Sequence, residues 1–207
     1  MSEPKFRRRK TERPAEIVEA AMAVFAEKGF AAAKIDEIAA RAGVSKGAVY
    51  LYFATKENLF HAVVSQGVGP NLAVLEQMAA AHQGPFRDLI GGLAAHLAHT
   101  AQTTPLGGVV KMVIGEAGNF PELARVWHEE VIAHGLGALA AAIEAAQRRG
   151  ELRRGDPRSY ALSLIGPLLV GVIWRETFVP VGARPFDLPT LISQHVETVL
   201  QGLETRP

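Results

Sequence analysis

The sequence contains no cysteine, and this absence removes disulfide bonds and thiolate metal ligands from consideration. It also lacks a strong charge of either sign, because the formal net charge is only +1. The most apolar run, residues 160–174, contains Pro167 and is shorter than the roughly 20 residues that span a membrane. We therefore expect a buried helix at this run and no membrane partner.

The first residues lack the apolar core and the cleavage site of a signal peptide, so the expected location is the cytoplasm. Residues 1–12 instead form a basic segment, which we predict to be a flexible arm that contacts DNA phosphates. A solvated tail is the alternative. The charged residues of the first thirteen positions are Lys5, Arg7, Arg8, Arg9, Lys10 and Arg13, against Glu3 and Glu12.

The apolar residues follow helical spacing throughout, and no alternation typical of strands is present. The first helix is predicted to begin near Pro14 and to end at Gly29. A later helix that begins at Thr55 is interrupted by Gly67 and Pro70, where it either kinks or ends and restarts. We predict an all-α protein of about nine helices. Those that follow the interruption are expected at about 71–82, 85–103, 109–117, 121–149, 158–178 and 189–203.

Residues 36–57 have the pattern of two short helices joined by a tight turn. Gly43 is placed to end the first helix, and Ser45 is placed to cap the second. Val49 and Phe53 lie four apart and are expected to point inward. The other face would then be outward, with Lys46, Gly47, Ala48, Tyr50, Leu51 and Tyr52. Such a helix fits a DNA major groove, although an apolar corner within a helical protein is the simpler alternative.

The run IAARAGVSKGAVYLYFATKENLF within this region resembles the DNA-binding domain of the TetR family of bacterial regulators, and the likeness extends over residues 13–63. The positions that match the family pattern are Ile38, Ala39, Ala42, Gly43, Val44, Ser45, Gly47, Val49, Tyr50, Tyr52, Phe53, Lys56, Glu57 and Leu59. The resemblance implies a three-helix DNA-binding domain at 13–55, with Phe25, Phe30, Ile38, Val49 and Phe53 as its core. It also implies a ligand-binding and dimerisation domain at 56–207, joined by the helix from Thr55.

One departure from the family pattern concerns the start of the second helix. Family members have Thr or Ser there as a cap, whereas this chain has Ala33 and Lys34. Lys34 could still supply a phosphate contact through its charge. The cap would be lost unless Asp36 supplies it.

The resemblance implies a DNA-facing role for eight residues: Lys34, Ser45, Lys46, Gly47, Ala48, Tyr50, Tyr52 and Lys56. We expect Lys46 to donate to guanine edges and Ala48 to meet a thymine methyl group, while Gly47 lets the backbone approach the DNA. Tyr50, Tyr52 and Lys56 are expected to bind phosphates, with Ser45 and Lys34 as lesser contacts.

The predicted helix at 158–178 is apolar almost all round, which a short chain has little room to bury. Together with the last helix it is expected to form a four-helix interface in a homodimer; the alternative is a central core helix of a monomer. A two-fold dimer reads two half-sites, so the expected partner is double-stranded DNA with a palindromic operator. The apolar residues expected in the last helix's share of the interface are Leu191, Ile192, Val196, Val199, Leu200 and Leu203.

The segment GEAGNFPELARVWHEEVI resembles C-terminal domains of the efflux-pump-repressor branch, which implies a small-molecule effector. We expect an apolar ligand. The candidate lining residues, which could equally be ordinary core, are Phe86, Met112, Phe120, Trp127, Trp174 and Phe178. Polar groups expected nearby are His96, His99, His128 and Glu116. The parts expected to move on ligand binding are 67–70 and 105–121.

Neither a catalytic nor a metal site is predicted. The pair His96 and His99 has helical spacing, but there is no HExxH motif, no G-x-S-x-G elbow and no carboxylate cluster. We expect no cofactor. The expected function is ligand-released repression of transcription, with activation as a variant. A helical enzyme or membrane-surface protein that retains a helix-turn-helix-like corner is the alternative.

Overall fold

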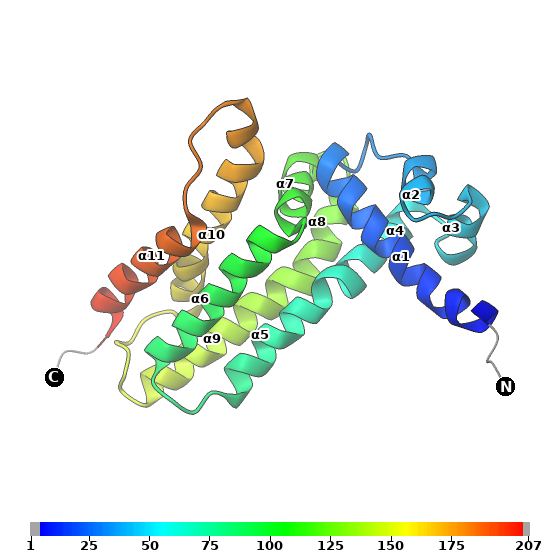
Figure 1. Cartoon of the computed structure of the whole chain (residues 1–207). Helices are drawn as coiled ribbons and strands as arrows, with labels where there is room; N and C mark the ends of the chain where they lie inside the picture. Colours follow the sequence, from blue (N-terminus) through cyan, green and yellow to red (C-terminus); the bar gives the residue numbers. More distant parts are fainter. Residues whose placement is uncertain (1–4, 205–207) are drawn as a thin grey trace. The chain divides into compact units, whose positions relative to one another are not determined.

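The computed structural model describes the backbone of residues 5–204 and the side chains of residues 13–204. This described part is helical and has no strand beyond one isolated bridge between Leu152 and Glu204, which confirms the all-α class (Figure 1). Packing divides the chain into two compact units. Unit 1 comprises Met1–Pro70 and Gly108–Glu130, and unit 2 comprises Asn71–Gly107 and Val131–Pro207. The domain boundary predicted between residues 55 and 56 therefore does not coincide with this division.

Eleven α-helical segments are present in the described residues. They are α1 (Lys5–Lys28), α2 (Ile35–Arg41), α3 (Lys46–Tyr52), α4 (Lys56–Ala62), α5 (Gly69–Ala81), α6 (Phe86–Thr103), α7 (Leu106–Glu116), α8 (Pro121–Trp127), α9 (Ala133–Arg148), α10 (Pro157–Thr177) and α11 (Leu188–Leu203). The π-helical stretches Val63–Val68 and His128–Ile132 join α4 to α5 and α8 to α9 without a break. Counted as continuous helices, they make nine, as predicted.

The predicted start of the first helix is wrong. Helix α1 begins at Lys5 instead of near Pro14, so residues 5–12 of the predicted arm are helical and the proline lies inside the helix. Of the two outcomes predicted near Gly67 and Pro70, an end and restart of the helix is absent, because the chain stays helical through Gly69; the irregularity there is the π-helical stretch Val63–Val68. Pro70 has no N–H for an α-helical bond, and the wider π-helical turns lie directly before it.

The core of unit 1 is built around three phenylalanines. Phe25 of α1, Phe30 of the following loop and Phe60 of α4 are at most 1% exposed, with ring centroids 5.5 to 6.2 Å apart. Ile38 of α2 and Val49 of α3 are fully buried as well. The predicted core of this region is confirmed, and it fixes α2 and α3 on α1.

Unit 2 packs α9 and α11 against α10, and α6 against α11 and α9. Its core consists of Phe86, Leu89, Ile90, Leu93, Leu139, Ile143, Leu164, Val172, Ile192, Val196, Leu200 and Leu203, among others. Arg87 of α6 holds the end of α11 by hydrogen bonds to the carboxylates of Glu197 and Glu204. The two carboxylates raise the pKa of the Arg87 guanidinium.

Helix α10 is apolar, yet much of it is not buried. Leu162, Leu169 and Val170 are 61%, 39% and 64% exposed. No charged residue lies between Arg158 and Arg175. With the turn that follows it, the segment Pro157–Val181 is long and apolar enough to cross a membrane by length and composition, which corrects the length comparison made from residues 160–174 alone.

Candidate nucleic-acid interface

Helix α3 is set by the residues at its two ends. Gly43 has a φ of 67°, the left-handed conformation that ends the preceding helix, as predicted. The Ser45 side chain then caps α3 by accepting a hydrogen bond from the backbone N–H of Ala48 at 3.2 Å. At the other end, the extended backbone of Phe53 stops the helix after seven residues. The result is a helix of seven residues whose two ends are both defined.

The two faces of α3 are those predicted. Val49 is fully buried and Phe53 is 9% exposed, whereas Tyr50 and Leu51 are 46% and 76% exposed. Tyr52 is half-buried, with its ring 6.5 Å from that of Phe53. The outward face therefore presents two hydroxyl-bearing rings, which can reach phosphate oxygens, beside small residues.

Within the described residues, no packing contact requires a glycine at position 47. A Cβ atom added there would meet only the Ser45 hydroxyl, at 4.0 Å. Glycine in a helix is otherwise costly, by about 0.8–1.0 kcal/mol relative to alanine. The missing side chain leaves room for something outside the subunit to approach this backbone.

Lys46 is joined to Asp36 of α2. Its ammonium lies 2.9 Å from the carboxylate, both side chains are more than half exposed, and the hydrogen bond to Asp36 raises the pKa of Lys46. Asp36 therefore does not cap α2. Lys34 is the N-cap residue of α2, and its side chain makes no capping hydrogen bond, as expected from the absence of Thr or Ser there. Exposed pairs of this kind are weak, so the Lys46 ammonium can leave Asp36 at little cost in free energy.

Lys56 is directed differently from the prediction. Thr55 caps α4 as predicted, by accepting from the Asn58 N–H at 3.0 Å. The Lys56 ammonium, however, donates to the carbonyls of Ala31 and Ala33 at 3.2 and 2.8 Å and lies 4.6 Å from the Phe30 ring centroid. Burial lowers its pKa. The charge expected to meet phosphate is thus engaged with the loop before α2.

Glu116 was expected near a ligand, and its position is the feature that sequence reasoning missed. Its two carboxylate oxygens accept hydrogen bonds from the backbone N–H groups of Phe30 and Ala31, at 2.8 and 2.7 Å. The partners lie 85 and 86 residues apart in the sequence. Only the tertiary structure brings them together, so no local pattern could have revealed the contact.

The seven candidate ligand residues are divided between the two units. Met112, Phe120, Trp127 and His128 belong to unit 1, whereas Phe86, Trp174 and Phe178 belong to unit 2. In unit 1, Met112 and Trp127 are 4% and 8% exposed, Phe120 stacks edgewise on Phe30 at 5.1 Å, and His128 is exposed. Met112 and Trp127 are thus core positions, Phe120 is half-buried against the core, and the histidine is exposed.

In unit 2, Phe86 is 1% exposed and belongs to the hydrophobic core. Trp174 instead joins Phe178 and Phe186 in a partly open aromatic group, with ring distances of 5.1 and 5.4 Å, and its indole donates to the Arg184 carbonyl. Phe86 is therefore a structural residue, while Trp174 and Phe178 keep apolar surface available.

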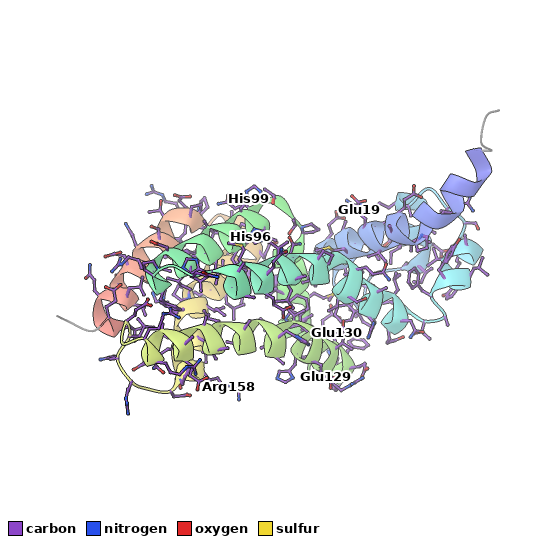
Figure 2. All side chains as sticks on the ribbon, turned by 90° about the horizontal axis from the view of Figure 1, so that it is seen from below. Glu19, His96, His99, Glu129, Glu130 and Arg158 are labelled. Carbon is purple, nitrogen blue, oxygen red and sulfur yellow. The ribbon has the colours of Figure 1, made fainter. Side chains whose placement is uncertain are left out.

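Among the histidines expected near a ligand, His96 stands out. Both His96 and His99 lie on α6 (Figure 2). The Nε2 atom of His96 is buried and has no hydrogen-bond partner within the described residues, whereas His99 is exposed. A buried polar atom without a partner costs free energy unless something supplies one.

Two family models match the chain. The model described as "Bacterial regulatory proteins, tetR family" matches residues 17–63, and "AefR-like transcriptional repressor, C-terminal domain" matches residues 91–200. Together they take in α2, α3 and most of unit 2. The second match alone spans more than half of the chain.

Known proteins resemble the chain over different lengths. The transcriptional repressor BepR of Brucella suis is 27% identical over 196 residues, 90% of each chain. The uncharacterised regulator YfiR of Bacillus subtilis is 37% identical over 89 residues, only 43% of each chain. A solved structure of SmeT with triclosan has a TM-score of 0.77 at 22% identity, over 93% of this chain and 92% of that one. SmeT represses the efflux pump SmeDEF of Stenotrophomonas maltophilia.

Proposed function

This chain belongs to the TetR family of bacterial regulatory proteins, and on that premise we propose that it is a homodimeric repressor that leaves a palindromic operator when a small ligand binds. It is a DNA-binding transcriptional regulator. The observation that carries the proposal is the outward face of α3, where Tyr50 and Leu51 are exposed on a helix capped by Ser45. A short capped helix of this kind enters the major groove.

Each outward residue of α3 has a role that follows from its chemistry. Lys46 reads guanine once it leaves Asp36, and Ala48 contacts a thymine methyl group. Gly47 permits close approach of the backbone. The hydroxyls of Tyr50 and Tyr52 bind phosphates, and Ser45 and exposed Lys34 contribute lesser backbone contacts.

The dimer forms through α10. Its exposed residues Leu162, Leu169 and Val170 lie on one helix face, and burial against a second copy removes this apolar surface from water. Four of the six apolar residues predicted for the share of α11 are turned into their own unit, whereas Leu191 and Val199 are half-buried. Ile192, Val196, Leu200 and Leu203 are 1–8% exposed within their own unit, because α11 packs on α6 and α10. The outward residues of α11 are polar, among them Ser193, Gln194 and Glu197, and suit an interface rim.

The effector is a small and mainly apolar molecule. Trp174 and Phe178 offer apolar surface in unit 2, and the unpartnered Nε2 of His96 offers one polar contact. The solved structure of SmeT with triclosan supports a small-molecule effector. The ligand acts only through a difference in affinity between the DNA-binding conformation and another one.

The test is selection of genomic fragments by the purified protein at two salt concentrations. We expect a palindromic sequence with half-site centres about 34–36 Å apart, bound more weakly at the higher salt concentration. Retention of fragments without a common sequence, or of none, would contradict the proposal. Vesicles of anionic lipid serve as a parallel sample, because binding to them instead of DNA would favour a membrane role for α10.

A further inference from the structure

The loop between α1 and α2, residues 29–34, leads directly into the helix-turn-helix. Helix α2 lacks a side-chain cap from Lys34, so its start depends on backbone hydrogen bonds and on the loop that precedes it. Gly29, with a φ of 82°, ends α1 and turns the following N–H groups in one direction. Successive N–H groups after a left-handed residue form a concave site for an anion.

The carboxylate of Glu116 occupies this site. It accepts one hydrogen bond from Phe30 and one from Ala31, at 2.8 and 2.7 Å, and charge-assisted bonds of this length are strong. The fit depends on Gly29, because a Cβ atom there would lie 2.2 Å from the Glu116 Oε1 atom. The glycine is thus needed both for its backbone angle and for the room that it leaves.

Lys56 binds the same loop at the backbone carbonyl groups of the loop. Its ammonium donates to Ala31 and Ala33, so Ala31 is fixed at its N–H by Glu116 and at its C=O by Lys56. The Phe30 side chain is 1% exposed and contacts the Phe120 ring, four residues beyond Glu116. The loop therefore has no freedom to shift independently of residues 116–120.

Glu116 is the last residue of α7, and α7 is itself pressed against α1. A Cβ atom at Gly108 would lie 2.6 Å from the Cβ of Ala26 and 2.9 Å from its backbone, so the two helices meet nearly backbone to backbone. A displacement of α7 along or away from α1 would strain the two hydrogen bonds that the Glu116 carboxylate accepts. The chain enters α7 from unit 2, because the division between the units falls at Gly107 and Gly108.

We infer that Glu116 is a positioning residue for DNA binding: by holding the N–H groups of Phe30 and Ala31, it fixes the loop that places α2 and hence α3. This inference rests on the proposed function, since DNA is what the placed helix reads. Lys56 is a second positioning residue, because it binds the carbonyl groups of the same loop. The hydrogen bonds from Phe30 and Ala31 to Glu116 are present without DNA, so they can be tested in the free protein.

The closing experiment compares Glu116→Gln with Glu122→Gln. Glu122 is an exposed carboxylate of the same unit that pairs with Arg125, so it controls for the charge change. In Glu116→Gln we expect amide hydrogen exchange at Phe30 and Ala31 to accelerate about 10-fold to 100-fold, the range for loss of a hydrogen bond to a charged group. Exchange in the control should match that of the wild type. Gly29→Ala, which displaces the carboxylate sterically, should act in the same direction.

The DNA readout separates positioning from a merely structural contribution. The affinity of Glu116→Gln for the selected operator should fall at least about 5-fold, while its affinity for random DNA stays within about 2-fold of the wild type, because random binding depends on phosphate contacts alone. Unchanged exchange at Phe30 and Ala31, or accelerated exchange with unchanged operator affinity, would overturn the inference. A wild-type protein without any sequence preference would overturn the proposed function, and the exchange rates would still decide the loop contact.

Discussion

Helices α3 and α10 both expose large apolar side chains, yet their surroundings differ. Leu51 of α3 is 76% exposed and Val170 of α10 is 64% exposed. Around Leu51 lie a lysine, two tyrosines, a glycine and an alanine, on a helix of seven residues. Val170 lies in the middle of a helix of 21 residues that carries no charge between Arg158 and Arg175. Exposure of an apolar side chain alone does not indicate its partner. The polar and charged residues around that side chain indicate which kind of partner suits it.

The two helices also differ in what fixes them. Helix α3 is short and relies on the Ser45 cap, on Val49 in the phenylalanine core and on the loop held by Glu116. Helix α10 is long, and its inner face, with Leu164 and Val172, packs into the core of unit 2. We therefore expect DNA binding by α3 to be sensitive to distant substitutions in unit 1. Dimer formation by α10 should be sensitive mainly to substitutions on the exposed face of α10.

The largest effect is expected from a charge on the outer face of α10. In the double variant Leu162→Glu and Val170→Glu, two-fold symmetry would bury four unpaired carboxylates, so we expect the dimer dissociation constant to rise by about 1000-fold or more. Light scattering coupled to gel filtration would measure the mass. Ala141→Glu, at an exposed position of α9, is the matched control and should remain a dimer. A double variant of unchanged mass would place the interface elsewhere.

The next effect is expected from Lys46→Ala on α3. Loss of a base-reading donor should weaken operator binding by about 5-fold to 150-fold and relax the preference at one base pair in each half-site. Binding to operator variants, measured by fluorescence anisotropy, would show both. Lys28→Ala is the control, because Lys28 pairs with Glu37 at 2.9 Å in the same unit but lies outside α3. An equal loss on every sequence would assign Lys46 to the phosphates.

Lys56→Ala distinguishes a phosphate contact from a loop contact. Since the Lys56 ammonium is engaged with the carbonyls of Ala31 and Ala33, we expect about a 10-fold loss of operator affinity without a change in its salt dependence. A direct phosphate contact would instead lower the slope of log K against log salt by about 0.9. Titrations at four salt concentrations would measure the slope, and a decrease of that size would return Lys56 to the DNA.

The smallest effect is expected from Gly47→Ala, which should change stability and DNA binding in opposite directions. The added methyl group meets nothing closer than 4.0 Å, so the free energy of unfolding should rise by up to about 1 kcal/mol. Operator affinity should fall several-fold, by about 3-fold to 10-fold, because the backbone can no longer approach the groove as closely. Thermal unfolding and anisotropy would measure the two quantities. Tighter binding would mean that this backbone lies away from the DNA.

Local chemistry made the helix-turn-helix predictable. The left-handed Gly43, the Ser45 cap and the four-residue spacing of Val49 and Phe53 are encoded within about a dozen residues, and the structure confirms each. The same holds for Thr55, which caps α4. Helix boundaries that depend on such caps were placed within a few residues.

Long-range contacts were not predictable. The cluster of Glu116, Lys56 and the loop at Ala31 joins residues up to 86 apart, and their spacing carries no periodic signal. The inward stripe of α11 was assigned to a dimer for a related reason. Helical spacing shows that Ile192 and Val196 share a buried face, but it does not show whether that face packs on its own chain or on a second copy. In the structure, Ile192 and Val196 pack within their own unit, where α11 lies against α6 and α10.

The central claim is that the exposed face of α3 meets a duplex and that the exposed face of α10 meets a second copy. Photo-crosslinking tests it most directly, with a benzophenone amino acid at Leu51 or at Val170 of the full chain in the presence of its selected operator. The account predicts that the probe at Leu51 yields protein–DNA adducts and the probe at Val170 yields protein dimers. Protein dimers from Leu51, or DNA adducts from Val170, would contradict it.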